Sequence, residues 1–274
     1  MSAYTAVLHL VKSAGGMTAY ARLTRRLYDI AYDLPQWDEV STYNYGYATV
    51  DDKVARDWPG EAYQIQLYAE VAKAVRAVAG PAPLAPSRLL EICCGRSGGL
   101  AYLCRELAPT TAIGLDRSLP PLRFGSTRYG AVAHIQGDAL KLPLASATID
   151  LAVNVEAMHN FPKLPFLIEI SRVLSPTGIF AAADSMPWAP EICQVGLTEL
   201  AGQAGLTVES FRDITANVRD ACRADGPRRR GLIARLPWYY RSIAREWVAV
   251  PGSTRFAQLE QQKRCYFLTV MRKI

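Results

Sequence analysis

The chain has 274 residues, half of which are hydrophobic, so it can bury a sizeable core in one large domain with appended helices. Its formal net charge is +6 and its pI is about 9.0, a mild excess that lies in good part in Arg228-Arg229-Arg230. No pattern typical of a nucleic-acid-binding module accompanies this run, so we predict a solvated charged face and no nucleic-acid partner. No apolar stretch approaches the ~18 residues of a membrane span and no leader pattern begins the chain, so a soluble, cytoplasmic protein is expected.

Six cysteines are scattered along the chain. Cys93 and Cys94 are adjacent, and a bond between them would strain the backbone. The sequence has no CxxC pair and no cluster of cysteine and histidine with the spacing of a zinc site. We therefore predict free, mostly buried thiols and no metal site.

A helix is predicted from near Met17, within an appended N-terminal arm of residues 1–40. Its apolar residues recur every three or four positions and form a narrow seam: Tyr20, Leu23, Leu27, Ile30 and Leu34. The seam packs either on the core of its own subunit or on a second subunit. The sequence leaves both open, so a homo-oligomer joined through this helix is one expectation.

Residues 41–86 are expected to form an aromatic loop and a helix ahead of the main domain. The loop contains Tyr43-Asn44-Tyr45-Gly46-Tyr47 and is followed by Trp58-Pro59-Gly60. The helix, whose apolar face includes Ile65 and Val75, ends at Gly80-Pro81, because these two residues stop helices. A linker from Pro81 to Pro86 then leads into the main domain, residues 87–274.

From Leu89 onward, apolar strand patterns alternate with helical patterns, which indicates a mostly parallel sheet wound on both sides by helices. The predicted strands are 88–92, 111–115, 131–136, 149–155, 177–183, 207–214 and 265–271, and the predicted helices are 98–107, 118–127 and 162–174. The last strand is expected to enter from the edge of the sheet and to run antiparallel. A helical cap insert of about 216–260 precedes it, and its aromatic residues form either the core of the cap or the wall of a ligand site.

The first predicted strand ends in a glycine-rich loop with the spacing Cys93-x-Gly95-x-x-Gly98. In an open α/β sheet, ligands bind beyond the carboxyl ends of the strands. A dinucleotide site uses three glycines against a pyrophosphate, but here the first is Cys93. A ligand that carries adenosine and an amino acid fits better, because Asp116 can accept from ribose hydroxyls and Asp138 from an adenine amino group.

The motifs in this order resemble those of class I S-adenosylmethionine-dependent methyltransferases, in the branch that acts on small molecules. The resemblance rests on these elements: Asn44-Tyr45-Gly46-Tyr47, the loop from Glu91 to Gly99, Asp116, Gly137-Asp138-Ala139 with Leu142-Pro143, Asp150, Glu156-x-x-His159-Asn160, and Arg172-Val173-Leu174-x-Pro176-x-Gly178. It implies a Rossmann-like α/β fold and S-adenosyl-L-methionine as cofactor, with S-adenosyl-L-homocysteine as its product.

The resemblance also implies roles for single residues of the cofactor site. Glu91 and Gly95 would hold the methionine end, Asp116 the ribose, and Asp138 with Ala139 the adenine. Tyr45 would cover the cofactor from the N-terminal side, and the expected site is completed by Cys93, Arg117 and Asn154. Cys93 and Ser97 stand where the family usually has glycine, so the Cys93 side chain must point away from the cofactor or the loop must shift.

The acceptor is expected beside His159, at the end of the fourth strand. A neutral imidazole there could take a proton from a substrate hydroxyl, or it could only shape the pocket. The candidate pocket residues are Tyr20, Trp58, Glu156, Trp188, Trp238 and Tyr239.

The resemblance to enzymes that act on phthiotriolone-type lipids and polyketides implies a bulky hydrophobic substrate of secondary metabolism. One alternative is C-methylation of a prenyl alkene coupled to cyclisation, as in teleocidin biosynthesis. Two others are a pericyclase that retains the cofactor without methyl transfer, and a regulatory protein with a degenerate loop.

Overall fold

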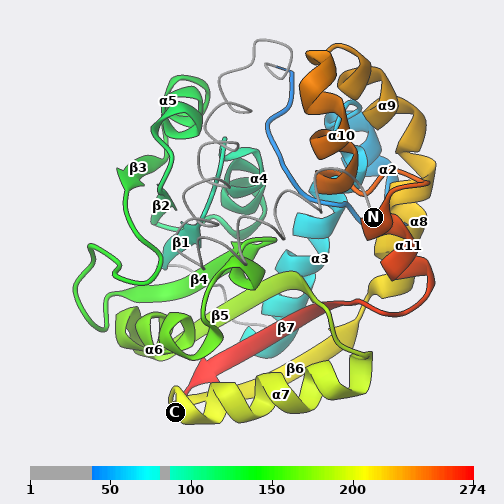
Figure 1. Cartoon of the computed structure of the whole chain (residues 1–274). Coiled ribbons are helices and arrows are strands. Elements are labelled where there is room, and N and C mark those ends of the chain that lie inside the picture. Colours follow the sequence, from blue (N-terminus) through cyan, green and yellow to red (C-terminus); the bar gives the residue numbers. More distant parts are fainter. Residues whose placement is uncertain (1–38, 81–86) are drawn as a thin grey trace.

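The computed structural model describes residues 39–80 and 87–274 (Figure 1). The predicted N-terminal helix, including Tyr20, and the linker from Pro81 to Pro86 lie outside the described residues. The predicted end of the arm at residue 40 is close to the start of the first described range. The predicted start of the main domain at residue 87 is the start of the second.

A seven-stranded sheet in the order β3-β2-β1-β4-β5-β7-β6 forms the centre of the molecule. Its strands are β1 (Arg88–Ile92), β2 (Thr111–Asp116), β3 (Ala133–Gln136), β4 (Ile149–Val155), β5 (Leu174–Met186), β6 (Leu206–Asp213) and β7 (Cys265–Lys273). All seven predicted strands are confirmed, with ends that differ by three residues at most. Strands β1 to β5 pair in parallel, and β7 runs antiparallel to both of its neighbours. The predicted doubly wound α/β architecture is confirmed.

The expected position of the last strand is wrong in one respect. Strand β7 lies inside the sheet, between β5 and β6, and β6 forms the edge. Every side chain from Cys265 to Met271 is buried, whereas only Leu206 of β6 is buried and its other residues are partly or fully exposed. A strand that is apolar on both faces needs a neighbour on each side and helices above and below, so β7 belongs to the interior.

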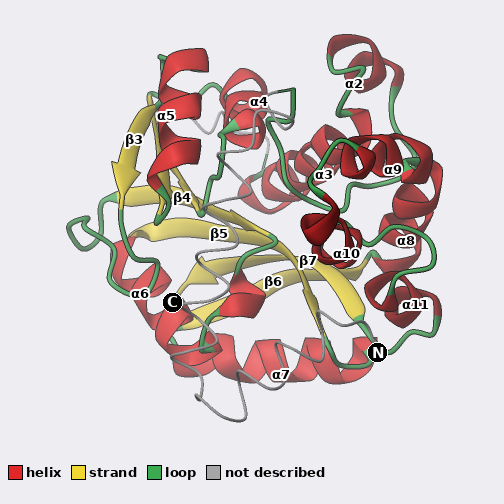
Figure 2. Ribbon diagram, turned by 45° about the horizontal axis from the view of Figure 1, so that its top comes forward, coloured by secondary structure: helices red, strands yellow, loops and turns green. Residues whose placement is uncertain are grey.

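Helices cover both faces of the sheet, as Figure 2 shows. On one face lie α3 (Ala62–Ala79), α4 (Gly98–Leu107) and α5 (Leu119–Arg128), and on the other lie α6 (Lys163–Val173) and α7 (Pro190–Gln203). The helices predicted at 98–107, 118–127 and 162–174 are thus confirmed, and α3 ends at Gly80 as expected, with φ of +83°. A short helix α2 (Asp52–Asp57) and helix α7 are additional. None of the helices in the described ranges is long and apolar enough to cross a bilayer.

Four helices occupy the segment between β6 and β7: α8 (Thr215–Ala224), α9 (Gly226–Ala234), α10 (Trp238–Trp247) and α11 (Thr254–Glu260). They lie together beside α2 and α3 (Figure 1). The prediction of a solvated face at Arg228-Arg229-Arg230 is wrong for two of the three residues. Arg229 is 3% exposed and pairs with Asp225 at 2.8 Å, and Arg228 pairs with the same carboxylate at 2.6 Å. Helix α9 directs Arg228 and Arg229 toward Asp225, which forms an ion pair with each of them.

Candidate functional site

The loop after β1 has the backbone conformation that glycine favours at two positions that are not glycine. Cys93, Gly95 and Ser97 have φ of +61°, +53° and +65°. Left-handed backbone costs an L residue such as cysteine or serine roughly 1–2 kcal/mol. Cys93 and Ser97 therefore adopt the conformation that glycine favours, and each lowers the stability of the fold by this amount. Cys93 remains partly exposed, and Ser97 is fully buried.

Ser97 is held by a histidine from β3. Its Oγ lies 2.9 Å from Nε2 of His134, and burial lowers the pKa of His134, which keeps the imidazole neutral at pH 7. This hydrogen bond uses the side chain that replaces the usual glycine. The contact of His134 with Ser97 therefore joins the loop to the sheet.

Gly98 and Gly99 leave room for other parts of the protein to pack closely. A glycine-rich loop can also leave room for a ligand, but here protein atoms occupy the space. A Cβ on Gly98 would lie 2.3 Å from Oγ of Ser41, and one on Gly99 would lie 1.9 Å from the ring of Tyr68. The backbone N–H of Gly98 donates to the Ser41 carbonyl at 3.1 Å. These two glycines therefore let the N-terminal loop and α3 pack directly on the start of α4.

Asp116 ends β2 and fixes the loop after β1. Its Oδ2 accepts from the Gly95 N–H at 3.0 Å, and its Oδ1 accepts from the Ser118 N–H at 2.8 Å. Burial raises its pKa above the ordinary value. Arg117, the next residue, is exposed, and its carbonyl accepts from Nε2 of Gln136 at 3.1 Å. Asp116 thus brings the glycine loop and the end of β2 together, as a site for adenosine requires.

Glu91 presents a buried carboxyl oxygen that the protein leaves unsatisfied. Its Oε1 accepts from the Tyr68 hydroxyl at 2.7 Å, whereas Oε2 has no hydrogen-bond partner among the described residues. Burial raises the pKa of Glu91 to about 8. A buried acceptor without a donor is costly, so this oxygen fits a ligand that supplies a donor, such as the ammonium group of an amino acid.

The remaining residues predicted for the cofactor site lie at the ends of β3 and β4. Asp138 is exposed and its Oδ1 accepts from the Leu140 N–H at 2.9 Å, while Ala139 is buried beside it. Asn154 is fully buried; it donates to the Ile92 carbonyl at 2.8 Å and accepts from the Met158 N–H at 2.9 Å. Its amide thus braces the exits of β1 and β4, and it supports the loop from beneath.

Tyr45 and Glu156 meet on the side of the site formed by the N-terminal loop. Oε1 of Glu156 accepts from the Tyr45 N–H at 2.5 Å and from the Tyr266 hydroxyl at 2.6 Å. The Tyr45 carbonyl accepts from Nη2 of Arg229 at 2.6 Å, so the basic run of α9 fixes this loop. Glu156 has φ of +53°, and burial raises its pKa to about 8. Glu156 is therefore a strained and mostly protonated group at neutral pH.

His159 forms a hydrogen-bonded pair with a carboxylate that the sequence analysis missed. Its Nδ1 lies 2.7 Å from Oδ1 of Asp184, and its backbone N–H donates to Oδ2 of the same residue at 2.9 Å. Asp184 is fully buried near the end of β5; burial alone would raise its pKa, but His159 and the surrounding donors hold that pKa below its ordinary value. An acidic residue directly after the apolar run Ile179 to Ala183 was the available signal.

The aromatic residues predicted for the pocket do not gather around His159. Trp58 packs against the core cluster that contains α3, and Trp188 packs beside Gly196 of α7. Trp238 and Tyr239 are 80% and 59% exposed. Helix α10 buries Tyr240 and Ala244, so its first two residues fall on the outer side. Tyr20 lies outside the described residues, and of the five candidates within them the structure brings only Glu156 into the group around His159.

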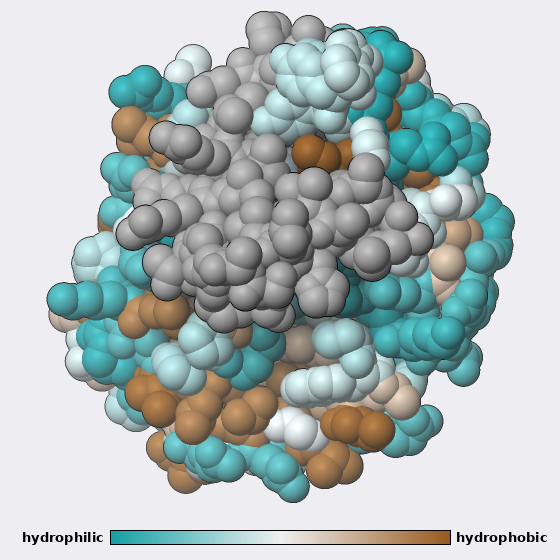
Figure 3. Space-filling model, in the orientation of Figure 1, coloured by the Kyte–Doolittle hydropathy of each residue, from teal (hydrophilic) through white to brown (hydrophobic). Residues whose placement is uncertain are grey.

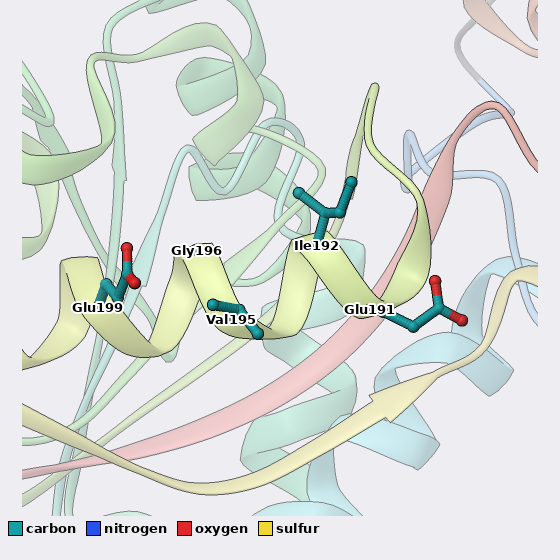
Figure 4. Close-up of a pocket in the computed structure, with 5 residues that line it drawn as sticks. All are labelled: Glu191, Ile192, Val195, Gly196 and Glu199. Carbon is teal, nitrogen blue, oxygen red and sulfur yellow. The ribbon is translucent and has the colours of Figure 1, made fainter.

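Two other features lie outside this group. Within the described ranges, no three His, Cys, Asp or Glu side chains are placed to hold a metal ion, and the six cysteines are free. A shallow depression on α7 is lined by Glu191, Ile192, Val195, Gly196 and Glu199 (Figure 4). All five residues come from one helix on the outside of the sheet, so the depression is a helix surface, separate from the carboxyl ends of β1 to β5.

Comparison with known proteins identifies the family. Residues 90–182 match the model of a methyltransferase domain. The phthiotriol/phenolphthiotriol dimycocerosates methyltransferase of Mycobacterium leprae is 30% identical over 96% of this chain and 97% of its own length. The fatty-acid O-methyltransferase of Mycolicibacterium smegmatis is 31% identical over 88% of this chain and 82% of its own.

A solved structure shows the same fold with the product of the cofactor bound. It is the geranyl diphosphate C-methyltransferase of Streptomyces coelicolor A3(2), in complex with Mg²⁺, geranyl diphosphate and S-adenosyl-L-homocysteine. Its TM-score is 0.60 at 15% identity, and the match covers 88% of this chain and 100% of that one. At this identity the match concerns the fold alone. With the sequence relatives, however, the conclusion is direct: this chain belongs to the S-adenosylmethionine-dependent methyltransferases, in the family that includes the phthiotriol/phenolphthiotriol dimycocerosates methyltransferases.

Proposed function

We propose that this enzyme transfers a methyl group from S-adenosylmethionine to a hydroxyl of a bulky hydrophobic small molecule of secondary metabolism, of lipid or polyketide type. The observation that carries the choice of a hydroxyl is the His159–Asp184 pair at the ends of β4 and β5. The names of the sequence relatives support a lipid acceptor.

The pair is suited to remove a proton. A carboxylate only accepts hydrogen bonds, so the 2.7 Å contact with Asp184 requires the proton of a neutral His159 on Nδ1. Nε2 then carries a lone pair, and the imidazole side chain is 29% exposed. An acceptor hydroxyl at Nε2 would lose its proton as its oxygen forms the new bond to carbon, and Asp184 would stabilise the imidazolium that results.

When bound, S-adenosylmethionine supplies an electrophilic methyl group on a sulfonium. For this chain we assign its methionine end to Glu91 and Gly95, its ribose to Asp116 with Arg117, and its adenine to Asp138 and Ala139. Cys93 and Asn154 shape the loop beneath it, and Tyr45 covers it. Displacement at a methyl group needs little acid–base assistance beyond the acceptor, so alignment of the two reactants supplies most of the acceleration.

Product mass tests this proposal. The enzyme is incubated with S-adenosylmethionine that carries a trideuterated methyl group and with long-chain alcohols, hydroxylated polyketides and prenylated indoles. We expect labelled ethers from the hydroxylated acceptors. A label on carbon would favour C-methylation of an alkene, and a rearranged product without label would favour the pericyclase; either result contradicts O-methylation.

We also propose that the enzyme acts in the cytoplasm as a homo-oligomer joined through the N-terminal arm. The support is the apolar seam of residues 20–34 in the sequence. Deletion of residues 1–34 should lower the mass measured by light scattering to that of a monomer. An unchanged mass would place the seam on its own subunit.

A further inference from the structure

Arg264, the residue before β7, is a buried cation whose hydrogen bonds all go to neutral groups. It is 8% exposed. Its Nη1 donates to Oγ of Ser185 at 2.9 Å and to the Ser185 carbonyl at 3.4 Å, and its Nε donates to Oε1 of Gln258 at 3.4 Å. No carboxylate of the described residues forms an ion pair with it, whereas the equally buried Arg229 is paired with Asp225.

A buried charge without a counter-charge is unfavourable, because it has lost its hydration and gained only weak partners. Burial, and after it the nearby guanidinium of Arg255, lowers the pKa of Arg264 to about 10. Arg264 therefore stays charged at pH 7 in surroundings that disfavour the charge. Such a position is typical of a group that a ligand of opposite charge completes.

Arg264 lies on the acceptor side of the site. It contacts Ser185, whose backbone N–H donates to Oδ1 of Asp184 at 2.6 Å, and Asp184 in turn holds His159. Two residues further along β7, and so on the same face of the strand, the Tyr266 hydroxyl donates to Glu156. Arg264 thus lies near two hydrogen-bonded pairs that flank the proposed position of the acceptor. One pair is His159 with Asp184, and the other is Tyr266 with Glu156.

The acidic side chains nearest to Arg264 have other partners. The Asp184 carboxylate accepts from His159 and from the backbone N–H groups of His159 and Ser185. Glu156 accepts from Tyr45 and Tyr266, and with its pKa raised to about 8 by burial it is mostly uncharged at neutral pH. Neither carboxylate is hydrogen-bonded to Arg264, so its guanidinium has no direct ion pair and can form one with a ligand.

We propose that Arg264 binds a carboxylate of the acceptor, so that the substrate is a hydrophobic molecule with an acidic end. A carboxylate matches one guanidinium in charge and geometry. A diphosphate carries more negative charge than this one guanidinium can balance. This inference rests on the proposed function: the carboxylate anchors the substrate at Arg264 while a hydroxyl faces His159.

Calorimetry on the full-length enzyme saturated with S-adenosylhomocysteine tests the proposal, with hexadecanoate, hexadecanol and hexadecyl phosphate as probes. We expect hexadecanoate to bind at least about tenfold more tightly than hexadecanol. Arg264→Gln should remove that difference, and Arg264→Lys should keep part of it. Arg235→Gln, which changes an exposed arginine paired with Glu39, should leave it unchanged.

Three results would overturn the proposal. They are equal binding of the acid and the alcohol by the wild-type enzyme, a preference for the acid that survives Arg264→Gln, and tighter Arg264-dependent binding of hexadecyl phosphate than of hexadecanoate. Thermal unfolding serves as a second readout. A purely structural Arg264 would lose stability as Arg264→Gln, whereas a binding residue keeps its melting temperature, because glutamine can still donate to Ser185.

The two proposals can fail separately. Methyl transfer to neutral hydroxyl acceptors without preference for acids would leave the proposed function standing and remove the role of Arg264. Arg264-dependent binding of hexadecanoate without methyl transfer to any hydroxyl would do the reverse.

Discussion

Two buried glutamates at the carboxyl ends of the strands differ from acidic residues at the amino ends of the strands and on the covering helices. At the amino end of β4, Asp150 accepts from the Arg88 N–H at 2.9 Å and from Oγ of Ser175 at 3.0 Å. On α6, Glu169 pairs with Arg172 at 2.7 Å, and this pair lowers the pKa of Glu169. At the carboxyl ends, by contrast, burial raises the pKa values of Glu91 and Glu156 to about 8.

Backbone strain is present at the same strand ends, although it is not confined to them. Cys93, Ser97 and Glu156 have positive φ and follow the carboxyl end of a strand, whereas Ala108 and Ala147, which precede β2 and β4, have positive φ as well. Strain and unsatisfied burial cost stability, so they persist where surrounding structure enforces them and a ligand compensates. The outer surface of α6 and α7 differs from these strand ends. It carries exposed apolar side chains, among them Ile168, Ile192 and Val195, and Figure 3 shows brown areas in the part of the molecule where these helices lie. Among the described residues, no buried side-chain nitrogen or oxygen without a hydrogen-bond partner belongs to α6 or α7, which distinguishes this surface from a ligand site.

The largest effect is expected at the His159–Asp184 pair. His159→Ala should lower kcat by about 10²–10⁴-fold, because a general base in the transition state is lost. Asp184→Asn should cause a smaller loss and displace the pH profile, since it positions His159 without touching the acceptor. Affinity for S-adenosylhomocysteine should stay unchanged in both. Asp220→Asn, an exposed carboxylate paired with Arg219, is the control and should keep full turnover.

The second-largest effect should distinguish the carboxyl ends of the strands from their amino ends by a change in cofactor affinity. Asp116→Ala removes the carboxylate that we assign to the ribose hydroxyls, and with hydrogen bonds to a charged group worth about 1.5–3 kcal/mol each, affinity for S-adenosylhomocysteine should fall roughly 100-fold or more. Asp150→Ala removes an equally bonded carboxylate at the other end and should leave affinity unchanged. Calorimetry measures both; equal losses would contradict the division.

Glu91→Gln should stabilise the enzyme at high pH. The pKa of Glu91 is 4.5 in the unfolded chain and about 8 in the folded protein, so between these pH values the folded state binds more protons. The free energy of unfolding therefore falls as the pH rises from about 4.5 to 8. Glutamine removes this loss, and the variant should become more stable than the wild type by a few kcal/mol near pH 8, with no difference near pH 4.

Glu169→Gln is the matched change on α6 and should have the opposite sign. The pKa of Glu169 is lowered, so the stability it contributes is present above its unfolded pKa and lost as the pH falls through its folded value. Its removal should therefore destabilise the enzyme modestly at neutral pH, because the pair is partly exposed to solvent. Denaturant unfolding across this pH range checks both variants, and the same sign for both would be incompatible with the account.

The smallest effects concern the loop backbone. Cys93→Gly should raise the free energy of unfolding by about 1 kcal/mol or less, because it relieves a positive φ without loss of a hydrogen bond. Ser97→Gly relieves similar strain but loses the contact with His134, so the two contributions should nearly cancel. Denaturant unfolding at one pH measures both. A large loss in Cys93→Gly would mean that the thiol has a packing role.

The strands and the places where they end could be predicted because both depend on local patterns. Apolar runs followed by Gly95, Asp116 or Asp138 mark strand ends from short windows of sequence. The place of β7 inside the sheet could not be predicted, because pairing across 80 residues of sequence depends on both faces of the strand being buried.

The acceptor side was less predictable than the cofactor side for the same reason. His159 was visible as a candidate, but its partner Asp184 lies 25 residues away and meets it only through the pairing of β4 with β5. Arg229 looked like part of a solvated run until α9 placed it against Asp225. Trp238 and Tyr239 looked like pocket walls, because sequence cannot tell which side of α10 faces inward.

The most direct test of the division between the two ends is the number of protons released when S-adenosylhomocysteine binds. Calorimetry at pH 7 in buffers of different ionisation enthalpy measures it. Since Glu91 is mostly protonated before binding and would then meet the ammonium group, we predict release of about one proton by the wild type and none by Glu91→Gln. Binding without proton release, or equal release by both proteins, would contradict the claim that the cofactor satisfies this carboxyl.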